Sequence, residues 1–209
     1  MITMASDSHS ELDLSQAFDV LVVGGGNAAL CAALTAQEAG AKVLLLEGSP
    51  KVFRGGNSRH TRNIRYLHES GNEHLTGPYL EDECWDDLMR VTEGQTNENL
   101  SRLLIRESNN VGAWMAKHGC MFQPAMRGTL QLARTNGFFL GGGKALMNAY
   151  YNTALKLGVE IVYEAEVSDL EICDGKFTSA VFGSQGASHK VRARPLLLLQ
   201  GDLRQIWNG

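Results

Sequence analysis

The stretch FDVLVVGGGNAA, residues 18–29, decides the fold of this chain. Its first half is a continuous apolar run, which is typical of a β-strand that is buried on both faces. Three glycines end the run, and the alanine-rich segment 27–39 then predicts a helix that stops at Gly40, because glycine adopts a left-handed cap without steric cost. Residues 42–47, KVLLLE, predict a second strand. A strand, turn, helix and strand within about 30 residues predict a right-handed crossover between parallel strands.

The glycine turn satisfies the dinucleotide-binding pattern G-x-G-x-x-A through Gly24, Gly26 and Ala29. These small residues allow a tight turn, a close approach of the backbone to a pyrophosphate, and close packing of the helix on the strand. Glu47 ends the second predicted strand 23 residues after Gly24, where a carboxylate accepts hydrogen bonds from an adenosine ribose and disfavours a 2′-phosphate. The alternative is a sharp turn without a ligand, beside a solvated Glu47. The coincidence of all these features favours nucleotide binding.

Composition and charge exclude several classes of function. The chain has 209 residues, 44% of them hydrophobic and 20% charged, which suits a soluble globular protein. Its formal net charge is -4, so we expect no binding to nucleic acid or to an anionic membrane surface. The four cysteines are scattered without a CxxC pair, and we expect a cytoplasmic setting and no metal site. Residues 1–17 lack the features of a signal peptide and are expected to form a disordered tail, and we expect no membrane insertion.

The remainder of the chain predicts an irregular segment, then helices, then short strands. Residues 48–77 are rich in Gly, Asn, Arg and His and have weak periodicity, which indicates a binding loop. Helical periodicity covers 79–91 and 97–118, and the leucines of the second segment indicate a packed scaffold helix. Three glycines at 141–143 precede another helix, 144–157. Strand candidates follow at 159–163, 167–173, 177–182 and 190–192, with a hairpin turn at Asp174-Gly175.

A second glycine cluster, RGGNS at residues 54–58, follows the second predicted strand closely. A plain NAD-binding module does not need such a segment, and that alternative is therefore disfavoured. The chain resembles the fumarate reductase/succinate dehydrogenase flavoprotein family, and most strongly its tricarballylate dehydrogenase branch, through GGGNAALCAAL, RGGNSRHTRNIR and GGGKAL. The resemblance implies an α/β fold over residues 18–194: a Rossmann-like FAD-binding domain with a parallel central sheet, a helical insertion and a small antiparallel β element. The FAD-binding residues that it implies are Gly24, Gly25, Gly26, Asn27, Ala28, Ala29, Glu47, Gly48, Arg54, Gly55, Gly56, Asn57, Ser58 and, through its backbone, Val167.

The mode of FAD attachment also follows from the resemblance. Membrane-bound succinate dehydrogenases carry FAD covalently on a histidine of this second segment, and alignment by the glycines places Asn57 nearest to that position. We therefore expect non-covalent FAD, with His60 as the alternative covalent anchor. Arg59, His60 and Arg62 form a polar loop face or, alternatively, contact a carboxylate-rich substrate, since arginine pairs bidentately with carboxylates.

The resemblance implies an oxidoreductase that transfers a hydride from a carbon next to a carboxylate to the flavin, as in the conversion of tricarballylate to cis-aconitate. The substrate would be a small polycarboxylate, and the physiological electron acceptor is unspecified. Relatives continue into a capping domain that supplies the residues that clamp the substrate. Because that domain is not in this chain, we expect no catalytic residue and no turnover by the chain alone. The alternative is a non-catalytic FAD-binding fragment or a pseudogene product.

The segment 195–209 departs from the family pattern. Residues 200–209 can be encoded so that another reading frame gives GGFEANMEW, which is the continuation that the resemblance implies. We therefore expect a frameshift near Arg194, with a real but divergent tail as the alternative.

Overall fold

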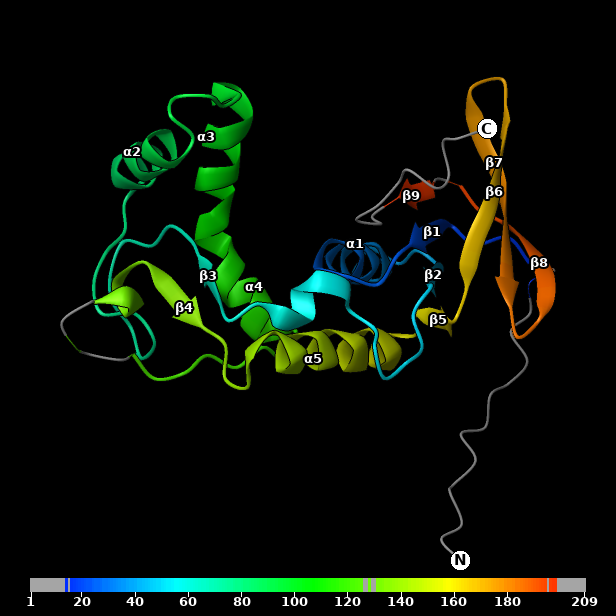
Figure 1. The fold of residues 1–209 in the computed structure, drawn as a ribbon, viewed down its shortest axis with the longest axis horizontal. Coiled ribbons are helices and arrows are strands. Elements are labelled where there is room, and N and C mark those ends of the chain that lie inside the picture. Colours follow the sequence, from blue (N-terminus) through cyan, green and yellow to red (C-terminus); the bar gives the residue numbers. More distant parts are fainter. Residues whose placement is uncertain (1–13, 15, 126–127, 129–130, 195, 199–209) are drawn as a thin grey trace, which may run out of the picture. The chain divides into compact units, whose positions relative to one another are not determined.

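The computed structural model describes residues 14, 16–125, 128, 131–194 and 196–198, the last three through their backbone only. The chain divides into two compact units. We call the described residues of 1–56 and 154–209 the sheet unit, and those of 57–153 the helical unit. Figure 1 shows the elements of both units along the chain.

The sheet unit contains a parallel sheet of order β5-β2-β1-β9. The strands are β1 (Val20–Val23), β2 (Val43–Glu47), β5 (Glu160–Tyr163) and β9 (Leu196–Leu198). All three neighbouring pairs are parallel, which confirms the predicted crossover and the parallel central sheet. Strand β9 lies within the segment expected to be divergent and was not predicted as a strand. The rest of that segment, residue 195 and residues 199–209, lies outside the described residues.

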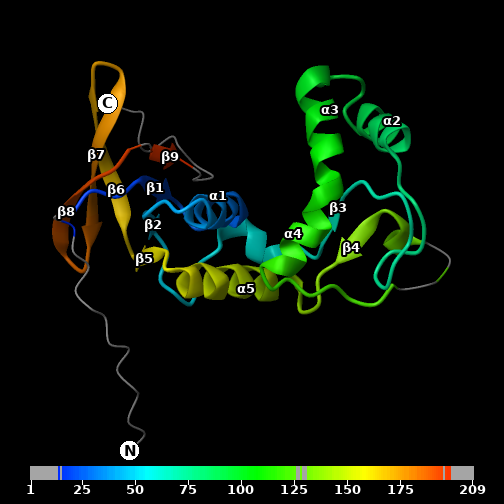
Figure 2. The same ribbon diagram turned by 180° about the vertical axis from the view of Figure 1, so that it is seen from behind.

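Helix α1 (Asn27–Glu38) covers one face of this sheet, as Figure 2 shows from behind. Every residue of β1 and β2 is buried, which is why both strands read as continuous apolar runs. The side chains of Ala29 and Ala33 are fully buried on α1, so the helix approaches the strands closely. Gly40 follows the helix with a φ of +87°, as predicted for its left-handed cap.

An antiparallel meander covers the other face of the sheet. It comprises β6 (Glu166–Cys173), β7 (Lys176–Ser184) and β8 (Ala187–Arg192) in the order β6-β7-β8. Asp174 and Gly175 both have positive φ, 51° and 71°, which matches the predicted hairpin turn. The shared core contains Phe18, Leu21, Val23, Leu44, Leu46, Ala165, Ala180, Phe182, Val191 and Ala193.

The helical unit contains short helices and a two-stranded sheet. Strands β3 (Asn63–Arg65) and β4 (Asn136–Phe138) pair antiparallel. The α-helices are α2 (Glu81–Val91), α3 (Glu98–Glu107), α4 (Val111–Lys117) and α5 (Gly142–Leu157), the last of which continues into the sheet unit. The 3-10 helices are η1 (Gly56–His60), which begins in the sheet unit, η2 (Ser108–Asn110) and η3 (Leu132–Arg134). Nowhere in the described part of the chain is a helix long and apolar enough to cross a membrane.

The single helix predicted over 97–118 was wrong, because η2 interrupts it. The Ser108 hydroxyl donates to the Ile105 carbonyl at 2.6 Å and accepts from the Leu67 amide at 3.0 Å. Such side-chain bonds compete with the regular helical pattern. The leucines that indicated a packed helix are exposed, with 64% exposure at Leu100 and 70% at Leu104. Helical spacing therefore identified the helix but not a buried face.

A buried histidine joins three segments of the helical unit. The His68 Nδ1 atom lies 2.8 Å from the Tyr66 carbonyl oxygen, and its Nε2 atom lies 2.9 Å from the carbonyl oxygens of both Gly77 and Arg134. Backbone hydrogen bonds between His68 and Tyr79 run in both directions. The segment 66–79 is thus fixed by hydrogen bonds to a buried side chain, although residues 66–77 belong to the predicted irregular loop and Tyr79 was predicted to begin a helix.

Substitution of Gly143 by Ala tests the packing at the start of α5. A Cβ atom there would lie 2.6 Å from the Thr61 Oγ1 atom and 2.9 Å from the Thr61 amide nitrogen. Alanine ordinarily stabilises a helix, but here we expect overpacking to lower the free energy of unfolding by about 1–3 kcal/mol. Urea unfolding followed by circular dichroism measures the change.

Gly183→Ala is the matched control for this variant, because no described atom lies within 4 Å of its added Cβ position. A Gly143→Ala chain as stable as the unsubstituted chain would contradict the packing described for Thr61.

Candidate cofactor site

The predicted glycine turn lies at the carboxyl end of β1. Gly24 has a φ of +101°, which other residues rarely adopt, and its N–H donates to the Leu46 carbonyl at 2.8 Å. The turn is therefore bonded to the neighbouring strand β2. Gly25 is buried, whereas Asn27 and Ala28 are exposed at the helix start. The structure thus brings the first six predicted cofactor residues, 24–29, into one strand-to-helix connection.

The start of α1 suits an anionic group. Gly26 is the N-cap and has no side chain to bond the first-turn amides, and the first turn contains no acidic residue. The positive end of the helix dipole is therefore not neutralised from within the turn. Burial raises the pKa of the Cys31 thiol, one turn further on, to about 11, so this thiol is also uncharged at neutral pH.

Glu47 and Gly48 lie beside the turn at the same edge of the sheet. Glu47 is the last residue of β2 and is only 7% exposed. Its Oε1 atom accepts a hydrogen bond from the Ser49 amide at 2.8 Å, which orients the carboxylate. Gly48 is exposed, and no described atom lies within 4 Å of the position that a Cβ atom would occupy there. The backbone at Gly48 is thus open to close approach.

Tyr163 is a residue that sequence reasoning missed. It ends β5 directly opposite Glu47 in the parallel register. Burial raises the pKa of its phenol, an effect that the positive charge of Arg54 opposes and the negative charge of Glu47 strengthens. Arg54, Glu47 and Tyr163 therefore share one electrostatic neighbourhood. Strand register with β2 was the signal that could have identified Tyr163.

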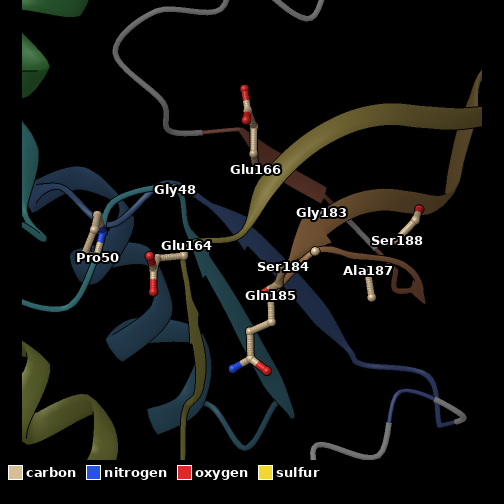
Figure 3. A pocket seen from close by; sticks show the side chains of 10 residues that line it. Gly48, Pro50, Glu164, Glu166, Gly183, Ser184, Gln185, Ala187 and Ser188 are labelled. Atoms are coloured by element: carbon tan, nitrogen blue, oxygen red, sulfur yellow. The ribbon is translucent and has the colours of Figure 1, made fainter.

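An open cleft of about 530 Å³ lies in the sheet unit next to these residues. Gly48 and Pro50 line one side of it, and the β7–β8 turn around Gln185 lines another. Figure 3 shows the carboxylates of Glu164, on the segment that joins β5 to β6, and of Glu166, the first residue of β6, both of which line this cleft. The Ala165 amide donates to the Glu47 carbonyl at 3.0 Å, which ties this segment to the end of β2.

Val167 follows Glu166 in β6, and its side chain packs against the core of the sheet unit. Any cofactor contact at this position would therefore use the backbone, as the resemblance implies. The resemblance also implies that Glu166 runs past the adenine together with Val167. Glu164 did not stand out in the sequence, because its significance depends on the bend between β5 and β6.

The second predicted segment spans the boundary between the units. Arg54, Gly55 and Gly56 belong to the sheet unit, whereas Asn57 and Ser58 belong to the helical unit. Gly55 and Gly56 have φ angles of +103° and +50°, so this bend requires glycine. One guanidinium nitrogen of Arg54 donates to the Lys51 carbonyl at 2.7 Å.

The sheet unit contains the features that a dinucleotide requires. An open helix start suits a pyrophosphate, an oriented carboxylate suits a ribose, and a cleft beside exposed backbone suits an adenine. The donor groups at the turn are backbone amides and the acceptor at the strand end is a carboxylate. The arrangement therefore fits a dinucleotide such as FAD.

Comparison with known proteins supports this fit. A family model described as "FAD binding domain" matches residues 19–207. The chain is 25% identical over 161 residues to an NADH:fumarate oxidoreductase of Klebsiella pneumoniae, which covers 74% of this chain and 17% of that protein. It is 26% identical over 195 residues to a Shewanella frigidimarina protein named probable fumarate reductase, covering 90% and 32% of the two. The chain thus spans about a third or less of these relatives.

Solved structures share the fold. A 3-ketosteroid-delta4-(5alpha)-dehydrogenase from Rhodococcus jostii matches with a TM-score of 0.76 at 22% identity, over 91% of this chain and 47% of that one. At this level of identity the match establishes the architecture and not the substrate. The predicted α/β fold is confirmed by this match together with the parallel sheet, the helices and the antiparallel meander.

Replacement of Glu47 by Ala tests the adenosine end of the site. We expect FAD binding to weaken by about 1.5–3 kcal/mol, because hydrogen bonds to a charged acceptor are lost. Fluorescence titration of the apoprotein with FAD measures the dissociation constant. Glu160→Ala, at the opposite end of the neighbouring strand β5, is the matched control and should leave the constant unchanged. Equal affinities of the two variants would mean that Glu47 does not contact the ribose.

Proposed function

Because the chain belongs to the FAD binding domain family, we propose that it is the FAD-binding part of a flavin-dependent dehydrogenase or reductase whose substrate is a small polycarboxylate. The single observation that carries the proposal is the position of the Gly24 turn and Glu47 on neighbouring strands at the carboxyl edge of a parallel sheet. Open α/β sheets bind their ligands at this edge.

The polycarboxylate class rests on two kinds of support. The segments RGGNSRHTRNIR and GGGKAL resemble the tricarballylate dehydrogenase branch. Two of the relatives carry names that refer to fumarate, which is a dicarboxylate. Conversion of tricarballylate to cis-aconitate is therefore the reaction type that we propose for the complete enzyme. The reductases among the relatives do not favour the alternative of a non-catalytic fragment.

FAD, when bound, supplies an acceptor or donor for two electrons at its isoalloxazine ring. The residues of this chain would bind and orient it. The amides at residues 24–29 would hold the pyrophosphate, Glu47 would accept hydrogen bonds from the ribose, and the Val167 backbone would contact the adenine. Residues 54–58 would continue along the cofactor towards the flavin. A cytoplasmic location, which the scattered cysteines support, belongs to the same proposal.

Ligand binding distinguishes the proposed substrate class from others in the family. The purified, FAD-loaded chain is titrated with tricarballylate and, separately, with the uncharged steroid androstenedione. The flavin absorption spectrum is recorded during each titration. We expect tricarballylate to perturb the spectrum and the steroid to leave it unchanged. Perturbation by the steroid alone would contradict the polycarboxylate class, and a purified chain without flavin bands would contradict FAD binding itself.

Non-covalent attachment of FAD is a separate expectation, because Asn57 occupies the position that the alignment gives to the covalent histidine. Precipitation with trichloroacetic acid should release all flavin into the supernatant, where its absorbance is measured. Flavin that stays in the washed pellet of the unsubstituted chain but not in that of His60→Ala would instead identify His60 as a covalent anchor.

A further inference from the structure

The turn formed by residues 58–62 is fixed against the start of α5 within the helical unit. The Thr61 hydroxyl donates to the Ser58 carbonyl at 2.7 Å, and the Gly143 amide donates to the Thr61 carbonyl at 2.7 Å. The Phe139 amide donates to the Arg62 carbonyl at 2.9 Å. Gly143 permits this approach, since a side chain there would overlap the Ser58 carbonyl. The turn therefore has a defined backbone geometry.

Two exposed cationic side chains flank this backbone contact. Arg62 follows Thr61, Lys144 follows Gly143, and both residues are exposed. His60 is exposed on the other side of Thr61. Arg62 and Lys144 therefore place a positive charge next to each end of the hydrogen bond between Gly143 and Thr61.

Arg62 differs from five other described arginines of the helical unit. Within the described residues, Arg65, Arg102 and Arg134 each form an ion pair with an acidic side chain, as do Arg90 and Arg106. No such partner of Arg62 occurs among the residues that the structure describes. An unpaired guanidinium in a chain of net charge -4 is a local site for an anion.

Chain connectivity keeps Arg62 near the predicted cofactor segment. Ser58 and Arg62 are four residues apart, so their Cα atoms lie at most about 14 Å apart even in an extended chain. The hydrogen bond of the Thr61 amide to the Ser58 carbonyl, 3.3 Å long, shortens this span further. A ligand bound by Arg62 would therefore lie close to Asn57 and Ser58 in space.

We propose that Arg62, with Lys144 beside it, binds carboxylate groups of the substrate. The inference rests on the proposed function, because it names the residues of this chain that would recognise a polycarboxylate. A guanidinium binds one carboxylate through two parallel hydrogen bonds, and an ammonium pairs with a second as a point charge. The pair therefore selects ligands with at least two carboxylates over monocarboxylates and over uncharged steroids.

Isothermal titration of the full 209-residue chain with tricarballylate tests this pair. Arg62→Gln should weaken binding about tenfold or more, since it removes charged hydrogen bonds. Arg62→Lys should give an intermediate affinity because it keeps the charge and loses the bidentate geometry. Arg90→Gln removes the same charge from an exposed site on α2 and should change the affinity less than about twofold.

A second measurement does not depend on any variant. Amide chemical shifts of the unsubstituted chain should move at Thr61, Arg62 and Lys144 when tricarballylate is added, and should move less with butyrate. Equal affinities of Arg62→Gln and Arg90→Gln would overturn the assignment, as would the absence of tricarballylate binding up to about 10 mM. Flavin content is measured on the same samples. If the Arg62→Gln chain contains FAD and still binds tricarballylate with unchanged affinity, this inference alone is refuted. If the unsubstituted chain contains no FAD, the proposed function is refuted.

Discussion

The hydrogen bond from the Gly24 amide to the Leu46 carbonyl fixes the glycine turn against the end of β2, at the edge of the sheet where we propose that the cofactor binds. It continues the β1–β2 ladder by one residue into the glycine turn, so the turn and the end of β2 have a fixed relation. The positive φ of Gly24, which other residues rarely adopt, then turns the chain away from the strand directly after this bond. Glu47, the next residue after Leu46, is thereby held beside the start of α1. The position of the Glu47 carboxylate relative to the start of α1 thus depends on this one backbone hydrogen bond.

The elements that local chemistry specifies were predictable from the sequence. Continuous apolar runs identified β1 and β2, and Asp174-Gly175 identified the β6–β7 hairpin, because buried parallel strands and tight turns restrict residue type strongly. The break at η2 was not predictable, since it depends on a hydrogen bond between Ser108 and the distant Leu67 amide. Tyr163 and Glu164 were missed for a related reason. Their place at the site follows from the register of β5 against β2, which pairs residues more than a hundred positions apart.

The predicted site residues fall into two groups, which lie in different units of the chain. Residues 24–29, Glu47 and Gly48 lie together in the sheet unit, so their association follows from strand order and backbone hydrogen bonds. Asn57 and Ser58 lie in the helical unit. For both groups, contact with the cofactor remains a prediction. The glycines at 55 and 56 separate the two groups, because their positive φ angles turn the chain at the boundary.

The three proposed binding regions differ in charge. The cleft is acidic, the glycine turn is uncharged, and the residues Arg62 and Lys144 are cationic; each suits a different chemical group. Glu164 and Glu166 at the cleft suit an adenosine, whose hydroxyl and amino groups donate hydrogen bonds, and they would repel a phosphate. The uncharged glycine turn offers amides and a helix dipole, which suit the pyrophosphate without a salt bridge. Arg62 and Lys144, further along the chain, suit carboxylates. In a chain of net charge -4, a local pair of exposed cationic side chains such as Arg62 and Lys144 favours an anionic ligand over a neutral one, so its position is informative about the substrate.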